Sequence, residues 1–177
     1  MGADSRKFPG LYKGVVVSNV DPYDYGRLQV SVEDLLGSVS TVWVEPSAPL
    51  AGMGSGAYVV PLEGSGVWVQ FVNGDPDRPV WTGFWRGDSG DVPTAAQAAP
   101  PGTPQIVLGT PGQNVLLISD LPGPEGGIIL QFASPGGAYI KLSAAGVELG
   151  ATAAGPTIRI TPALIDLGNG ALQITGG

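Results

Sequence analysis

The hydrophobic and polar positions in the last part of the chain follow one short pattern. An aliphatic residue, a polar residue and a second large apolar residue are followed by a turn rich in Gly, Ala, Ser, Thr or Pro. Side chains alternate between the two faces of a β-strand, so each triplet places its apolar residues on one face and its polar residue on the other. The triplets are Leu130-Gln131-Phe132, Ile140-Lys141-Leu142, Val147-Glu148-Leu149, Ile158-Arg159-Ile160, Ile165-Asp166-Leu167 and Leu172-Gln173-Ile174.

Strands this short cannot enclose a core within one chain, because each presents only two apolar groups. Repeated units that cannot bury their own apolar face must stack on copies of themselves. The pattern therefore predicts a building part of an assembly. An uneven half of an ordinary β-sandwich is the alternative interpretation.

The first part of the chain reads as short strands separated by turns. Arg27–Val32 alternates cleanly and places Leu28, Val30 and Val32 on one face. Further strands are expected at Gly14–Ser18, Val42–Val44, Val67–Val72 and Val80–Trp85. About five strands within residues 8–86, with no stretch of helical period, indicate a small closed barrel of the oligonucleotide/oligosaccharide-binding (OB) type. No helix longer than a turn or two is expected anywhere.

The composition divides the chain into four parts. Eleven of the thirteen aromatic residues lie at or before Trp85. Residues 87–105 are mainly Gly, Asp, Ser, Pro, Ala and Gln without periodicity, and we expect a linker there that is extended in its proline-rich part, 100–104. The predicted organisation is an N-terminal arm over 1–11, a barrel over 12–86, this linker, and a shaft over 106–177.

Charge and missing residue types exclude several functions. The net charge is −7 and the isoelectric point is near 4.3, with eight scattered Lys and Arg residues, so no nucleic-acid partner is expected. There is no Cys and no His, which removes disulfides, thiol chemistry and the usual catalytic triads. No signal peptide and no run long enough to cross a bilayer is recognisable, so synthesis in the cytoplasm is expected.

Two acidic clusters could be considered for acid–base chemistry. Asp75, Asp77 and Arg78 form one, and the other contains Asp21, Asp24 and Arg27. Both lie in Pro- and Gly-containing turns, and charges that satisfy loop backbone groups are the preferred interpretation. We therefore expect no catalytic residue, no metal, no cofactor and no enzymatic activity.

Two other features admit a binding interpretation. The run Gly52–Gly56 lacks the Lys and the following helix of a phosphate-binding loop, so a turn or a close approach between chains is preferred. The tryptophans could stack on sugars or bases, although packing in the core or between subunits is preferred. They are Trp43, Trp68, Trp81 and Trp85.

The first domain resembles a known family. The segments GVVVSNVDPYDYGRLQVSV and AGMGSGAYVVPLEGSGVWVQFVNGDPDRPVWTGFW, in this order, resemble the barrel domain of phage baseplate assembly protein V. Contractile-tail central spikes and the valine-glycine-repeat spike proteins of type VI secretion share this domain. The resemblance covers about residues 12–86, and the downstream triplets resemble the intertwined β-helix that follows the barrel in those proteins.

The resemblance implies an all-β homotrimer, in which an OB-fold barrel precedes an intertwined, triple-stranded trimeric β-helix. Three chains would aim the apolar residues of the triplets at the shared axis and leave the polar residues outside. The expected trimer core is Leu130, Phe132, Ile140, Leu142, Val147, Leu149, Ile158, Ile160, Ile165, Leu167, Leu172 and Ile174.

The function implied by the resemblance is mechanical. The chain would be the central spike of a contractile injection system, docked on a baseplate hub protein and piercing the target cell envelope. A small conical tip protein is expected on the blunt end at Gly176-Gly177. A phage tail, a tailocin and an extracellular injection particle stay open, as do the target organism and the payload.

Some family properties do not carry over. The linker is too short for the lysozyme domain of larger relatives, and without His the metal-binding tip of some short relatives is not expected. The second hypothesis is a carbohydrate-binding module on a trimerising β-helical stalk. A cell-wall hydrolase is the third.

Overall fold

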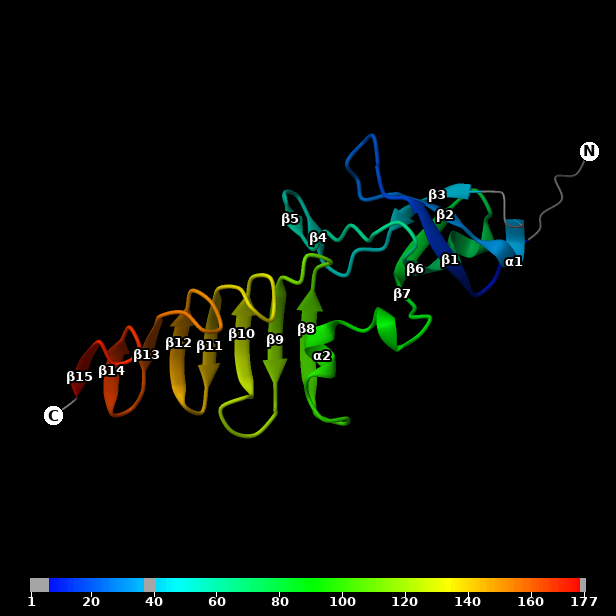
Figure 1. The fold of residues 1–177 in the computed structure, drawn as a ribbon. Coiled ribbons are helices and arrows are strands. Elements are labelled where there is room, and N and C mark those ends of the chain that lie inside the picture. The colour runs from blue at the N-terminus through cyan, green and yellow to red at the C-terminus, as the bar shows by residue number, and fades with distance from the viewer. Residues whose placement is uncertain (1–6, 37–40, 176–177) are drawn as a thin grey trace, which may run out of the picture. The chain divides into compact units, whose positions relative to one another are not determined.

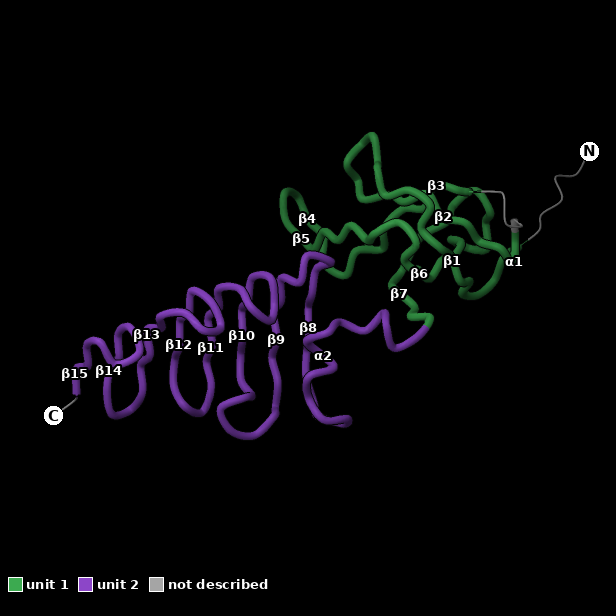
Figure 2. Tube along the Cα trace, in the orientation of Figure 1, with its two compact units in different colours: residues 1–87 green, residues 88–177 purple. Residues whose placement is uncertain are grey.

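The structure is a computed structural model that describes residues 7–36 and 41–175 (Figure 1). The chain divides into two compact units, residues 1–87 and residues 88–177 (Figure 2). The two C-terminal glycines, where the tip protein is expected, lie outside the described residues. So do residues 1–6 of the expected N-terminal arm.

The first unit is a closed five-stranded barrel with the strand order β1-β2-β3-β7-β6. β3 and β7 pair in parallel, and the other neighbours pair antiparallel. One shift of register in the β1–β2 pair and one in the β6–β7 pair mark the irregularities that help a short sheet to curve into a barrel. The strands are β1 (Leu11–Ser18), β2 (Leu28–Ser31), β3 (Thr41–Pro46), β6 (Gly66–Phe71) and β7 (Pro79–Phe84).

Alternating side chains fill the barrel. Leu28, Val30 and Val32 are completely buried, as the sequence predicts from their period of two. Gly14 of β1 allows β2 to come close, because a Cβ there would lie 2.4 Å from Cγ1 of Val30. The buried cluster consists of Val16, Leu28, Val30, Val32, Val44, Val67, Val69, Phe71 and Trp81.

Short elements decorate the barrel. They are α1 (Glu33–Leu36), the hairpin strands β4 (Ala51–Gly52) and β5 (Ser55–Gly56), and the single turn η1 (Val72–Gly74). The predicted N-terminal arm contributes to the barrel: Phe8 packs against Tyr12 and Phe71, and its amide donates to the carbonyl of Gly74.

The second unit is one antiparallel sheet of eight strands in the order β8 to β15, which Figure 1 shows side by side from green to red. Each strand pairs with its neighbours in sequence. The strands are β8 (Gln105–Gly109), β9 (Val115–Ser119), β10 (Gly127–Gln131), β11 (Tyr139–Ser143), β12 (Gly146–Gly150), β13 (Thr157–Ile160), β14 (Leu164–Leu167) and β15 (Leu172–Thr175). The all-β class and the OB-type barrel are therefore confirmed. Within one chain, the shaft is a sheet whose hydrogen bonds join neighbouring strands of that chain.

The expected linker contains structure that the sequence did not indicate. It includes η2 (Ser89–Asp91) and α2 (Thr94–Gln97), and α2 packs beside β8. The side-chain amide of Gln97 donates to the backbone carbonyls of Ser89 and Val92. These hydrogen bonds hold the segment in shape, although it has no hydrophobic core. The proline-rich part forms a turn closed by the bond from the Thr103 amide to the Pro100 carbonyl, and not the extended segment expected.

Candidate trimerisation face

The second unit carries two rows of aliphatic side chains on one face. The register sets Ile140 opposite Leu130 and Leu149, and the same pairing continues in both directions along the sheet. One row contains Leu108, Leu116, Leu130, Ile140, Leu149, Ile158, Leu167 and Leu172. The other contains Ile106, Ile118, Ile128, Leu142, Val147, Ile160, Ile165 and Ile174. We call these two rows the apolar face.

The apolar face is uncovered in the single chain. Its exposed members keep from 38% (Ile165) to 63% (Leu108) of their surface in contact with solvent, and Leu116, Val147 and Leu167 are half-buried. Among the described residues of this unit, Val115 is the one hydrophobic residue that is fully buried, and it points to the opposite face. This sheet therefore has no hydrophobic interior of its own, in contrast to the barrel.

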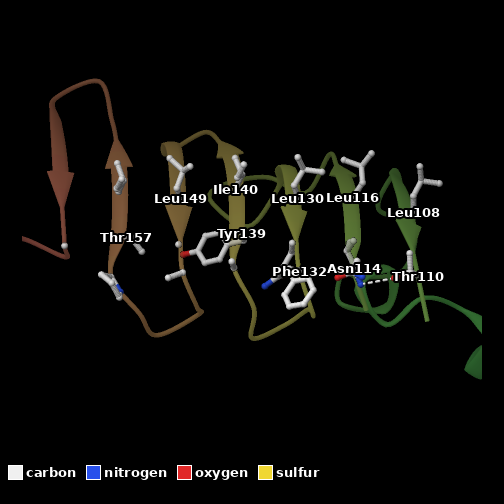
Figure 3. A pocket seen from close by; sticks show the side chains of 18 residues that line it. Leu108, Thr110, Asn114, Leu116, Leu130, Phe132, Tyr139, Ile140, Leu149 and Thr157 are labelled. Carbon is white, nitrogen blue, oxygen red and sulfur yellow. Dashed lines mark hydrogen bonds between the residues drawn. The ribbon is translucent and has the colours of Figure 1, made fainter. Parts of the chain in front are cut away.

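A shallow groove of about 990 Å³ runs along one row of this face. Figure 3 shows Leu108, Leu116, Leu130, Ile140 and Leu149 projecting to the same side from successive strands. No charged residue lines the groove. Its chemistry suits another apolar surface better than a polar ligand.

The opposite face has a charged central row. After Val107, Leu117 and Ile129 in the first three strands, the row continues with residues of alternating charge and ends in an amide. These residues are Lys141, Glu148, Arg159, Asp166 and Gln173. Cross-strand neighbours of opposite sign attract one another, so the order of charges supports this register.

Glu148 is the centre of a small polar network on that row. Nε of Arg159 lies 3.0 Å from its Oε2, and the hydroxyl of Tyr139 donates to its Oε1. The Tyr139 hydrogen bond, together with the Arg159 guanidinium, lowers the pKa of Glu148. The same hydrogen bond raises the pKa of Tyr139. The network therefore holds Glu148 ionised and the phenol protonated.

The structure brings the predicted core residues together. Eleven of the twelve lie on the apolar face, and Phe132 follows directly after β10, where it is 65% exposed and lines the groove. Sequence reasoning missed further members of the face in β8, β9 and β10. They are Ile106, Leu108, Leu116, Ile118 and Ile128. Those strands are apolar on both sides, so no polar residue marks which side chains share a face.

The acidic clusters of the barrel unit form turns. The Asp21 carboxylate accepts hydrogen bonds from the amides of Tyr23, Tyr25 and Arg27, and its Oδ1 lies 2.6 Å from the Arg27 side chain. The Arg27 side chain and these amides hold the pKa of Asp21 far below its usual range. In the other cluster Asp75 accepts from the amide of Asp77, again within a turn. Both carboxylates serve the local backbone.

The tryptophans are mainly packed. Trp81 is buried and its indole donates to the Gly26 carbonyl, while the Trp85 indole donates to the Gly14 carbonyl. Trp68 is half-buried, and Trp43 is 37% exposed beneath the Arg27 guanidinium. Of the four rings, Trp43 is the most exposed, and the Arg27 guanidinium lies 4.9 Å from its centroid.

Residues 7–36 and 41–175 contain neither a candidate metal-binding group nor a candidate helical membrane span. No three His, Cys, Asp or Glu residues gather there as a metal-binding group. No helix in these ranges is long and apolar enough to cross a membrane.

A barrel that folds on its own core, joined to a sheet that leaves its apolar face bare, is typical of a subunit of a larger assembly. Comparison with protein families makes this specific. Residues 12–85 match the family model described as type VI secretion system/phage-baseplate injector OB domain, and residues 105–173 match the phage baseplate V C-terminal trimerisation domain. The chain belongs to the baseplate V and type VI spike family, as its motifs indicate.

The chain is also similar in sequence to a curated spike protein. The type VI secretion system spike protein VgrG4b of Pseudomonas aeruginosa is 32% identical over 108 residues, which is 57% of this chain and 13% of that protein. The chain thus spans a small part of that relative's length. Except for Ile174, the predicted core residues lie within the segment that matches the trimerisation domain. Family membership supports a structural role in a spike.

Proposed function

We propose that the chain is the structural subunit of a homotrimeric central spike in a contractile injection system. The observation that carries the proposal is the uncovered apolar face, which continues without a break through all eight strands of the second unit. The match to a trimerisation domain over residues 105–173 supports three copies in particular.

Each copy brings a complete sheet to the proposed trimer, because its strands are hydrogen-bonded to neighbours in the same chain. What a copy lacks is a cover for one face. Three such sheets around an axis, with their apolar faces inward, form a three-sided prism. Fully burying an aliphatic side chain contributes about 1.5–3 kcal/mol, so covering a half-exposed one adds roughly 1 kcal/mol at each position.

The polar face suits the outside of this prism. Lys141, Glu148 and Arg159 then lie on the outer side, where their alternating signs keep the surface wettable without a strong field of one sign, while Asp166 on the same row is buried and accepts from the Gly170 amide. Each sheet has only β8 and β15 as edge strands, so few free edges are left along the rod for fraying and unwanted pairing. These properties are those of a stiff, soluble needle.

The barrel and the shaft have separate proposed tasks. The barrel matches an injector OB domain, and we infer that it docks on a baseplate hub protein. The prism is proposed to point toward the target, to concentrate the force of contraction on a narrow end and to pierce the envelope, with a conical tip protein at its C-terminal end. A phage tail, a tailocin and an extracellular injection particle stay open as the machine that carries the spike.

Electron microscopy of particles from the producing cell tests this role. A peptide tag at the N-terminus of the chain, labelled with gold, is expected at the distal axial end of each particle. Label along the sheath or on fibres would refute a central spike. An untagged strain processed in parallel controls for adventitious gold.

A further inference from the structure

A second uncovered surface lies in the barrel unit, on the segment that joins β3 to β6. Residues 47–62 leave the barrel, form the β4–β5 hairpin and return. We call this segment the arm, and it is distinct from the N-terminal arm over residues 1–11. The arm contains no charged residue, although the chain has a net charge of −7. Its hairpin has only two paired residues in each strand, which is too little to be stable alone in water.

The arm exposes apolar side chains. Met53 stands fully exposed at the tip between Gly52 and Gly54, and Leu50 and Tyr58 keep about two thirds of their surface in solvent. The base of the hairpin is well defined, because the Ala57 amide donates to the Leu50 carbonyl at 2.8 Å. At the C-terminal end of the arm, the Pro61 carbonyl accepts from the side chain of Asn19.

The same unit carries a groove of about 740 Å³, which is lined mostly by the arm itself and otherwise by Tyr25, Gly26, Pro46 and the end of β7. Its walls include Tyr25, Tyr58 and Phe84, and no charged residue lines it. The Trp81 indole, which also borders the groove, already donates to the Gly26 carbonyl. The groove therefore offers aromatic and small apolar surfaces to whatever fills it.

We propose that the arm of one barrel packs its Met53 tip into this groove on the barrel of the next subunit. The inference rests on the proposed homotrimer. Met53 is not part of the groove lining, so one barrel carries both a protruding tip and, under the same arm, a recess. A head-to-tail contact of this kind closes into a ring when its rotation matches the three-fold axis.

Charge favours a second copy of the chain as the partner. Identical copies carry the same net charge of −7 and repel one another except through uncharged surface. The arm and the groove are both such surfaces. Methionine suits the tip, because its unbranched thioether adapts to an irregular apolar recess.

Tethering supplies the remaining affinity. The sheet unit holds three chains together in the proposed trimer, so contact between the barrels becomes intramolecular and their effective concentration rises. A small contact that would be too weak between free molecules then becomes populated. This explains why an arm of sixteen residues could suffice.

Cross-linking tests the contact directly, since the chain contains no Cys. In the full-length protein, Met53→Cys is combined with Thr82→Cys, which lies on the groove. Treatment with a short bis-maleimide is expected to give a covalent trimer as the main product on a denaturing gel. The control combines Met53→Cys with Thr41→Cys, an exposed position that does not line the groove, and is expected to stay monomeric on the gel.

The mass of the same samples under native conditions separates the two possible failures. A native trimer that yields only monomeric product, or as much cross-linking from the control pair, overturns this inference and leaves the spike intact. The arm would then belong to a different partner, such as the hub. A native monomer would instead contradict the proposed function itself. Ser47→Cys in place of Thr82→Cys repeats the test on another part of the groove lining.

Discussion

Ile160 allows the apolar face to be tested with one side chain. It is 43% exposed in the single chain and pairs with Val147 and Ile165 in the middle of its row. In Ile160→Asp, three carboxylates would face one another near the proposed axis, and an unpaired buried charge costs about 3–5 kcal/mol. We predict loss of the trimer, measured as a native mass that falls to that of one chain.

A matched control places the same charge on the other face. Ser143→Asp lies on the same side of β11 as Lys141, where a carboxylate meets solvent and a cation. This variant is expected to remain trimeric. If Ile160→Asp is as trimeric as Ser143→Asp, the inward assignment of Ile160 is wrong.

Glu148 gives a prediction for pH. Its folded-state pKa is lowered, first by the Tyr139 hydrogen bond and also by Arg159, relative to about 4.3 in an unfolded chain. Its contribution to stability is therefore complete above that value and is lost as the pH falls through the folded pKa. We predict that Glu148→Gln lowers Tm at pH 7 and that the difference from the parent protein shrinks in acid.

Thermal unfolding between pH 7 and pH 3 checks this behaviour. Glu125→Gln serves as the control, because Glu125 is mostly exposed and lies 3.8 Å from Lys141 at the edge of the network. Its effect on Tm is expected to be small at every pH. A difference for Glu148→Gln that grows in acid would mean that the network does not hold the carboxylate ionised.

At the scale of elements, two glycines allow neighbouring strands of the sheet to approach each other closely. Gly127 begins β10 and Gly146 begins β12, both with positive φ. A Cβ on either would lie 2.0 Å from a backbone carbonyl oxygen of the neighbouring strand, on Leu142 or Ile160. Only glycine fits such a position, because both the conformation and the space exclude a side chain.

Gly146→Ala is therefore predicted to destabilise the sheet by about 1–3 kcal/mol, the cost of a strained backbone, plus the cost of the steric contact. Urea unfolding of the trimer measures the change. Gly136→Ala is the control, since Gly136 has open space where the Cβ would be added. Equal midpoints for the two variants would contradict the close approach at Gly146.

The elements also show what could be predicted from the sequence. The triplets and Arg27–Val32 were predictable, because a period of two marks a strand and its inner face. The face of β8 was not, since Ile106, Val107 and Leu108 are apolar on both sides. α2 was missed because its segment is held by hydrogen bonds from the Gln97 side chain to backbone carbonyls. Such bonds produce no periodic pattern of hydrophobic residues in the sequence.

For the whole molecule, the contrast between the two units is the main result. The barrel buries nine core residues, whereas the described part of the sheet buries Val115 alone among its hydrophobic residues. The sequence predicted this division, because aromatic residues gather before Trp85 and short triplets follow. It could not show that each copy brings a finished sheet, since pairing between strands depends on contacts that a local pattern does not record.

Sedimentation equilibrium of the full-length chain tests the central claim most directly. The chain has a mass of 17.9 kDa, and the account predicts a species three times as heavy at micromolar concentration, with no stable folded single chain on dilution. A compact, fully folded monomer at that concentration would contradict the account. It would mean that the two aliphatic rows of the sheet can remain in water.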